Sequence, residues 1–369
     1  MRKKKLLFID YIHSSVRDLL NYYEQNLKVD FDDQVDIVIY KKPYTRNRSS
    51  IIGILERKWY LLKQFRKADL VVGDTYTHAI FKWAKKSMYI FHGALTKRHP
   101  AKNHNALTER GGDLRRMDYV VGFSKRDQDN YMLDQDGKPN GDFELLPLGL
   151  PRNDQLFSEA YKKESRTYYD DKYDLGGKRI VLYAPTFRNY SEEIKLPFSA
   201  SDFERLNEFF KLNNWVMIYR PHYIENIVPR EYLEDKENIL ILDSTKEEDS
   251  QKLLAATDVL MTDYSSIYVD FLILDRPICF LPFDLELYER EKGLVIDFNN
   301  KACIPGPIIS DSDHLLSFFN DINEAKDGFT ERRNLSKNYY FEYFDNQSCK
   351  RVWDAILNDV LALKKERQK

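Results

Sequence analysis

The feature that most constrains the fold of this chain is an alternation of short β-rich runs with helical stretches, which occurs in both halves. In the first half, periodicity and composition predict strands at residues 5–10, 35–40, 68–74, 87–93 and 117–124, and helices at 14–27 and 77–86. In the second half, they predict strands at 178–186, 215–222, 238–243, 258–263 and 276–284, and helices at 199–214, 246–257 and 265–275. Such alternation is typical of parallel sheets with helices on both faces, so the sequence predicts an α/β protein.

A break at residues 143–154 divides the chain, because FELLPLGLPRND interrupts the alternation with two prolines and a glycine. A length of 369 residues also exceeds one ordinary core. We therefore expect a Rossmann-like domain at 1–150 and a second one at 151–345. The helical pattern at 346–369 can pack back on the first domain. The two doubly wound parallel-sheet domains are expected to face each other across a cleft.

Composition excludes some classes of function. The 57 basic and 59 acidic residues give a net charge of -2, which argues against a nucleic-acid partner. The apolar runs are far shorter than the roughly 18 residues that a membrane-spanning helix needs. Asp10 interrupts the apolar start, which is too short for a signal peptide. Three widely spaced cysteines indicate a reducing compartment, so we expect a cytoplasmic protein.

Polar residues follow the strand predicted at 258–263. In open parallel sheets, ligands bind outside the carboxyl ends of strands. Here Asp263 is followed by Ser265 and Ser266, where a helix is expected to begin. The free N–H groups of a helix start favour a phosphate, and serine hydroxyls add donors. Simple N-capping is the alternative, but a cap needs one serine and this stretch offers two.

Two histidines also follow predicted strands. His92 precedes Gly93, and its unperturbed pKa of about 6.5 suits a proton acceptor. The alternative is a structural histidine bonded to a nearby carbonyl. His222 follows Arg220, and together they form a better anion site than either residue alone. Pro221 between them fixes the backbone and so the direction of both side chains.

Thr186 and Arg188 follow another strand, and a guanidinium suits phosphate, although an ordinary loop arginine is the alternative. Arg152 lies at the predicted domain junction. Together these residues suit a diphosphate-containing substrate. The chain has no G-x-x-x-x-G-K-[ST] loop, no G-x-G-x-x-G after the first strand and no G-x-S-x-G elbow.

Six stretches carry a family resemblance: FHGALTKR, GLPRND, VLYAPTFR, YRPH, TDYSSIYVDF and RPICFLPFDLELYEREKGLVIDF. In this order, they resemble the CDP-glycerol glycerophosphotransferase family of teichoic-acid primases and polymerases. The resemblance implies a GT-B fold and a CDP-glycerol or CDP-ribitol donor. It implies transfer of alditol phosphate to a lipid-linked saccharide or growing polymer, with release of CMP. It also implies peripheral contact with the cytoplasmic face of the plasma membrane.

The resemblance gives these residues roles. His92 is expected to be the base on the acceptor side, while His222 and Arg220 support the leaving CMP. Ser265 and Ser266 are expected to bind the diphosphate. Further binding candidates are Gly93, Arg152, Thr186, Arg188, Asp263 and Asp270, the last toward a ribose or glycerol hydroxyl. No cofactor is firmly implied; Mg²⁺ stays open, since Asp263 could help to hold one, although no ligand cluster argues for it.

Two rival functions remain on the sequence alone. One is a GT-B glycosyltransferase that uses a nucleotide sugar, because the fold and diphosphate site would be similar. The other is a non-catalytic binding protein that has kept the fold, although a scaffold would not need both histidines and the serine pair.

Overall fold

A computed structural model describes residues 2–10, 14–41, 59, 62–74, 84–91, 93, 96, 117–127, 143–188, 198–221, 228–243 and 249–363. The chain forms two compact units. Unit 1 comprises Met1–Gly93, His104–Asp154 and Asp345–Lys369, and unit 2 comprises Ala94–Asn103 and Gln155–Phe344. These units divide at 154/155 and 344/345, within a few residues of the boundaries expected at 150/151 and 345/346. The segment Ala94–Asn103, expected in the first domain, belongs to unit 2.

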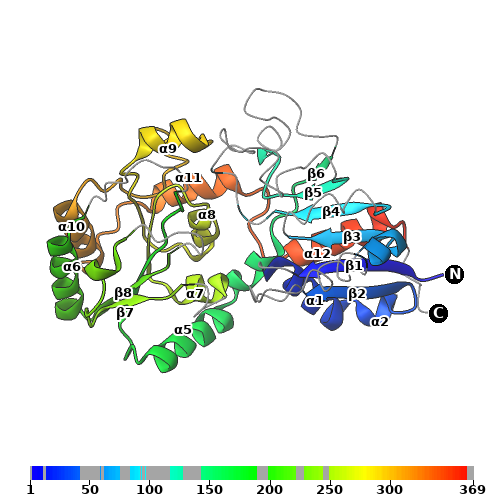
Figure 1. Ribbon diagram of the computed structural model, residues 1–369, viewed down its shortest axis with the longest axis horizontal. Coiled ribbons are helices and arrows are strands. Elements are labelled where there is room, and N and C mark those ends of the chain that lie inside the picture. The colour runs from blue at the N-terminus through cyan, green and yellow to red at the C-terminus, as the bar shows by residue number, and fades with distance from the viewer. Residues whose placement is uncertain are drawn as a thin grey trace. The chain divides into compact units, whose positions relative to one another are not determined.

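Unit 1 contains a six-stranded sheet in the order β2-β1-β3-β4-β5-β6, and every pair is parallel (Figure 1). Its strands are β1 (Lys4–Asp10), β2 (Val35–Lys41), β3 (Leu70–Gly73), β4 (Ser87–Ile90), β5 (Tyr119–Val121) and β6 (Glu144–Leu146). The central strands β3 and β4 are buried along their whole length, as continuous apolar runs in a covered parallel sheet should be.

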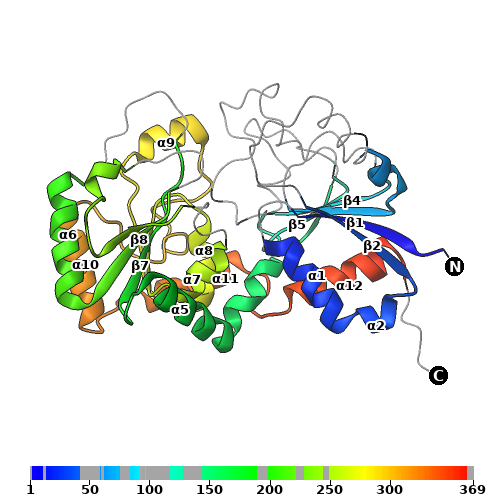
Figure 2. The same cartoon turned by 60° about the horizontal axis from the view of Figure 1, so that its bottom comes forward.

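The described helices of unit 1 come from both ends of the chain. They include α1 (Ser14–Asn26), α2 (Lys28–Phe31), α12 (Ser348–Asp354) and a π-helical turn, η6 (Ala355–Val360). Trp353 of α12 packs against Phe8 and Tyr23 and donates a hydrogen bond of 2.8 Å to the carbonyl of Leu19. The two views agree that α12 lies beside α1 (Figure 2). The C-terminal helix is therefore part of the core of unit 1.

Asp127, just after β5, makes unit 1 sensitive to pH. Its side chain is 5% exposed, and it accepts main-chain N–H groups from Phe123 and Ser124. Burial raises the pKa of the carboxyl to about 6, although these N–H groups lower it. A carboxyl with a higher pKa in the folded chain binds more protons there, so its contribution to stability is present at low pH and declines as pH rises from about 4 to about 6.

We expect Asp127→Asn to remove this pH dependence, since an amide oxygen can still accept the N–H groups without a buried charge. The variant should exceed the wild type in free energy of unfolding by about 2 kcal/mol at pH 7, and the difference should shrink toward pH 4. Urea unfolding at both pH values measures this difference. A variant less stable than the wild type at pH 7 would show that the carboxylate is favourable where it lies.

Unit 2 contains a five-stranded parallel sheet in the order β11-β10-β7-β8-β9. Its strands are β7 (Arg179–Tyr183), β8 (Trp215–Tyr219), β9 (Ile239–Ile241), β10 (Val259–Thr262) and β11 (Ile278–Phe280). This is the Rossmann order. Strands β8 and β9 follow on one side of β7, whereas β10 and β11 lie on its other side, so the order of strands reverses between β7 and β10. The α/β fold with two parallel sheets that the sequence predicts is therefore confirmed.

The α-helices described in unit 2 flank this sheet. They are α5 (Glu159–Tyr173), α6 (Ala200–Asn213), α7 (Ser250–Ala256), α8 (Ile267–Phe271), α9 (Leu285–Lys292), α10 (Ser312–Asn323) and α11 (Thr330–Tyr340). Three 3₁₀ segments accompany them: η3 (Pro151–Phe157) across the 154/155 boundary, η4 (Arg230–Tyr232) and η5 (Leu272–Leu274). Across the described part of the chain, no helix combines the length and apolar character needed to cross a bilayer.

A helix cap differs from the expected one. The sequence suggests a helix from 199 with Ser201 or Asp202 as its cap, whereas Ser199 caps α6. Asp202 is the third helical residue, and its carboxylate accepts the Ser199 N–H in a capping box.

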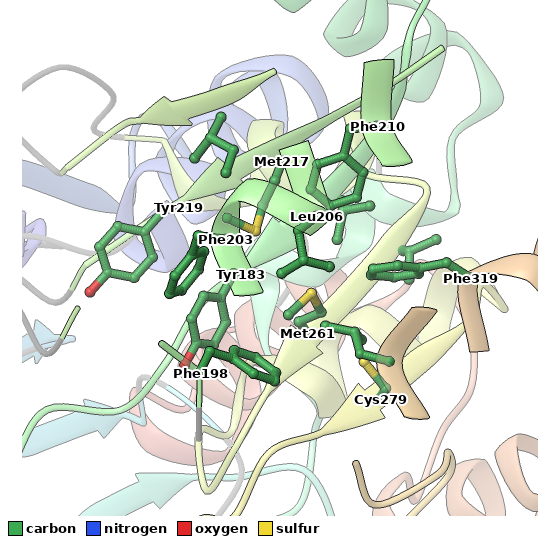
Figure 3. Close-up of a cluster of buried hydrophobic side chains, with 14 of the residues drawn as sticks. Tyr183, Phe198, Phe203, Leu206, Phe210, Met217, Tyr219, Met261, Cys279 and Phe319 are labelled. Carbon is green, nitrogen blue, oxygen red and sulfur yellow. The ribbon is translucent and has the colours of Figure 1, made fainter. Parts of the chain in front are cut away.

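Helices α6 and α10 cover one face of the sheet around a core rich in aromatic residues (Figure 3). Phe210 of α6 and Phe319 of α10 lie 5.7 Å apart between ring centroids, and Phe319 also contacts Trp215 of β8. Tyr183 and Tyr219 lie near the carboxyl ends of β7 and β8 in the same cluster. This packing makes the ends of the two strands a rigid platform.

Candidate functional site

The carboxyl ends of β7 and β10 meet where the strand order of unit 2 reverses, the position at which doubly wound sheets bind ligands. The backbone N–H of Thr186, after β7, lies 2.9 and 3.1 Å from the two carboxylate oxygens of Asp263, after β10. The hydroxyl of Thr262 also donates to the carbonyl of Ala184 at 2.8 Å. These bonds join the two loops that border the reversal.

Arg188 holds the same loops from below the surface. Its side chain is 0% exposed and forms ion pairs with Asp263 and, at 2.8 Å, with Asp284 after β11. The guanidinium also lies over the rings of Tyr264 and Phe283, at 5.3 and 4.8 Å from their centroids. Burial acts to lower the pKa of Arg188, but the two carboxylates outweigh it and raise the pKa. The arginine therefore stays charged, and its ion pairs tie together three strand ends.

This geometry changes two expectations from the sequence. Arg188 was expected to contact phosphate, but its buried guanidinium faces two carboxylates, so the structure assigns it to holding the strand ends. Asp263 was a candidate ligand for substrate or Mg²⁺. Its oxygens instead accept the guanidinium and the N–H groups of Thr186 and Tyr264. A carboxylate surrounded by these donors does not fit a metal ion. Among the described residues, no cluster of three or more acidic, His or Cys side chains is arranged to hold one.

The turn at Ser265 and Ser266 is short and partly exposed. Ser266 is the N-cap of α8, yet its side chain makes no capping hydrogen bond. Within the described part of the chain, Ser265 Oγ accepts one long bond, 3.4 Å, from the N–H of Ile267. The helix expected at 265–275 contains five α-helical residues followed by a 3₁₀ turn, so its dipole is small. The two hydroxyls, more than the dipole, are what this turn offers to a ligand.

Other predicted residues of unit 2 lie at the same edge of the sheet. Thr186 Oγ1 is buried and has no hydrogen-bond partner among the described residues. A buried hydroxyl without a partner is costly, which favours a bound group. Arg220, after β8, is partly exposed, and its N–H donates to the carbonyl of Tyr183 at 2.9 Å. Strands β10, β7 and β8 thus bring Ser265, Ser266, Thr186 and Arg220 to one edge.

The remaining predicted residues are not part of this group. Asp270 is only 2% exposed, within α8, so the expected contact with a ligand hydroxyl is not supported. Gly93 and Arg152 are buried in unit 1. His92 and His222 lie outside the described residues.

Sequence reasoning missed two residues that shape the site. Asp284 pairs with Arg188, and its Oδ1 accepts a 3.0 Å hydrogen bond from the hydroxyl of Tyr264. Tyr264 is fully buried and stacks on Tyr288 at 4.2 Å between centroids. Asp284 is the last residue of the strand predicted at 276–284, so its place at a strand end was a usable signal. The tyrosine resembled any other core aromatic.

Comparisons with known proteins show what this chain is similar to. The sequence model of the family described as CDP-Glycerol:Poly(glycerophosphate) glycerophosphotransferase matches residues 1–358. A teichoic acid poly(ribitol-phosphate) polymerase of Bacillus spizizenii is 31% identical over 219 residues, which are 58% of this chain and 33% of the relative. A teichoic acid glycerol-phosphate primase of Bacillus subtilis is 33% identical over 224 residues, 59% of this chain and 52% of the relative.

These curated relatives are longer, and the matched part is about one third to one half of their length. The solved structure of the wall teichoic acid polymerase TagF has a similar fold, with a TM-score of 0.66 and 20% identity. That similarity covers 98% of this chain and 90% of the TagF chain. Because the family model spans nearly the whole sequence, the chain belongs to the CDP-glycerol:poly(glycerophosphate) glycerophosphotransferase family.

Proposed function

We propose that this chain transfers glycerol phosphate, or a related alditol phosphate such as ribitol phosphate, from a CDP-alditol to a hydroxyl group and releases CMP. The acceptor is a polyprenyl-diphosphate-linked sugar or a growing polymer of the teichoic-acid type. The match of the family model to residues 1–358 carries this proposal. A polyprenyl acceptor is held in the bilayer, so the proposal includes peripheral contact with the cytoplasmic face of the membrane.

The edge of unit 2 supports the donor side of this proposal. A diphosphate needs donors aimed at its oxygens, and the hydroxyls of Ser265, Ser266 and Thr186 can supply them. Arg220 would add positive charge from the neighbouring strand end. The buried pairs of Arg188 keep the loops in place before the donor arrives. Such preorganisation is how proteins stabilise charge that develops during phosphoryl transfer.

In the proposed reaction, the acceptor hydroxyl attacks the β-phosphorus, which bears the alditol. A bond forms between this phosphorus and the acceptor oxygen, while the bond to the oxygen that bridges the two phosphates breaks. CMP departs with the bridging oxygen, and His92 takes the proton of the acceptor hydroxyl. His222 and Arg220 would support the negative charge on CMP. No step requires a metal ion at Asp263.

The proposal is tested by screening donors for nucleotide release with a defined lipid-linked disaccharide as acceptor. CDP-glycerol, CDP-ribitol and UDP-N-acetylglucosamine are supplied in parallel, and CMP and UDP are quantified. We expect CMP from one or both CDP-alditols, in equal amounts with the alditol phosphate units added to the acceptor, and no UDP. UDP release with sugar transfer would favour a glycosyltransferase. Binding of a CDP-alditol without release would indicate a non-catalytic relative.

A further inference from the structure

Strand β2 lies at one end of the unit 1 sheet and pairs with β1 alone among the described strands (Figure 1). It is seven residues long, whereas the other strands at sheet ends, β6, β9 and β11, have three residues each. The outer edge of β11 is also covered at one point, where Phe280 forms a bridge with Ile308. Short or covered edges protect a sheet from pairing with other chains. In the described part of the chain, β2 is the edge that lacks this protection.

The unit 2 sheet has one more strand at the corresponding edge. There, β8 lies beside β7, the first strand of the sheet, and β9 pairs with β8 on its far side. Strand β2 has the same place beside β1, the first strand of unit 1, but no described strand lies beyond it. On this side, the described unit 1 sheet therefore ends one strand earlier than the unit 2 sheet.

The main chain of β2 presents a row of hydrogen-bonding groups at this edge. The N–H of Lys4 in β1 donates to the carbonyl of Gln34, and Lys4 aligns with Val35 in the parallel register. Because main-chain groups alternate in direction along a strand, those of every second residue from Val35 to Lys41 point away from β1. One of these residues is Ile39, which is 45% exposed. The edge therefore offers both main-chain bonds and apolar surface to another strand.

The charges along β2 favour an antiparallel copy of the same strand as its partner. Asp33, just before the strand, and Asp36 within it are exposed, whereas the last residue of the strand is Lys41. An antiparallel copy would bring the acidic start of each strand to the basic end of the other. A parallel copy would instead place like charges side by side. A second β2 strand in antiparallel orientation therefore complements this edge.

One register of this pairing places apolar residues opposite one another. Val38 is the middle residue of β2, so a two-fold axis at Val38 pairs all seven residues of both strands. Ile37 then lies opposite the partner's Ile39 in a hydrogen-bonded pair. Val38 lies opposite its own copy in a non-hydrogen-bonded pair, with Cα atoms about 4.5 Å apart. Moving the axis by one residue would instead pair Asp36 with Val38, or Ile37 with Lys41.

We propose that the β2 edge is the interface through which two copies of this chain form a symmetric dimer. The two β2 strands run antiparallel, and the two-fold axis passes between the two copies of Val38. The six-stranded sheets of the two unit 1 domains thus join into one continuous sheet. This inference concerns unit 1 alone and does not depend on which reaction the chain catalyses.

Disulfide cross-linking of the full chain tests the register. Val38→Cys places two thiols within reach of each other, since linked cysteines have Cα atoms about 4.4–6.8 Å apart. Ile39→Cys is the matched control, because its copy is offset by two residues along the strand, which separates the Cα atoms by more than about 7 Å. The three native cysteines, Cys279, Cys303 and Cys349, are buried, so the wild type supplies the background.

After oxidation with oxidised glutathione, we expect Val38→Cys to run as a covalent dimer on a denaturing gel, and dithiothreitol should reverse it. Ile39→Cys and the wild type should run as monomers. Equal yields of dimer from the two cysteine variants would indicate random collision and overturn the register. No covalent dimer from Val38→Cys would overturn the interface.

Sedimentation velocity over a range of concentrations measures the association without a cross-link. Ile39→Lys should weaken dimerisation about 10-fold, because an edge lysine opposes strand pairing and occurs twice in a symmetric dimer. Val29→Lys is the control, because Val29 in α2 is 93% exposed but lies outside β2, so this variant should dimerise like the wild type. A wild type that stays monomeric at every concentration, or an equal loss in both lysine variants, would overturn the proposal.

Discussion

Replacement of Arg188 by methionine is expected to remove about 3–5 kcal/mol from the free energy of unfolding, one of the largest losses that a single change in unit 2 can cause. The arginine is fully buried between Asp263 and Asp284. Methionine fills part of the volume but removes the guanidinium with which both carboxylates are paired. Because both are almost inaccessible to water, neither can regain hydration without opening the site.

Urea unfolding of the full chain measures this loss, and Arg205→Met is the control. Arg205 also pairs with a carboxylate, that of Asp313, but both side chains are largely exposed. An exposed pair contributes about 0–1 kcal/mol. Arg188→Lys should fall between wild type and Arg188→Met, because an ammonium restores charge without the forked geometry. If Arg188→Met matched Arg205→Met in stability, the buried cluster would not hold unit 2 together.

Replacement of either histidine by alanine is expected to lower CMP release about 10²- to 10⁴-fold, the usual cost of losing a general acid or base. We expect this for His92→Ala because the acceptor hydroxyl would lose its proton acceptor. For His222→Ala, we expect it because the leaving CMP would lose support. Single-turnover assays with saturating CDP-alditol isolate the transfer step from donor binding.

His314→Ala is the matched control for both variants. This histidine is exposed on α10. Its backbone N–H, which alanine retains, donates to the cap at Asp311, and its ring makes only a long contact of 3.5 Å with Ser310 Oγ among the described residues. Thermal unfolding of all three variants establishes that they are folded at the assay temperature. A near-full rate in His92→Ala or His222→Ala would remove that residue from the reaction.

Both sheets and most of their strands could be predicted from the sequence, because buried parallel strands are continuous apolar runs that begin and end at polar residues. The short edge strand β6 was missed, since Glu144 and Pro147 make its surroundings resemble a loop. Helix α5 was also missed, because it buries only Ser165 and Tyr169 and so lacks a clear apolar stripe.

The strand-end rule found the residues at the edge of unit 2, but it could not assign their roles. Arg188 looks like a phosphate ligand in sequence, because its partner Asp284 lies 96 positions away. Thr96 lies within the stretch FHGALTKR, but its hydrogen bond to Tyr264 spans 168 positions and has no signal in the sequence. A single sequence states which groups are present at strand ends, whereas their pairing depends on packing between distant segments.

We propose that the diphosphate of the CDP-alditol binds at the carboxyl ends of β7 and β10. A crystal structure of the chain with CDP-glycerol tests it most directly. We expect phosphate oxygens about 3 Å from the hydroxyls of Ser265 and Ser266, with Arg188 still enclosed by its two carboxylates. A diphosphate bound elsewhere, with both serine hydroxyls facing only water, would contradict the account.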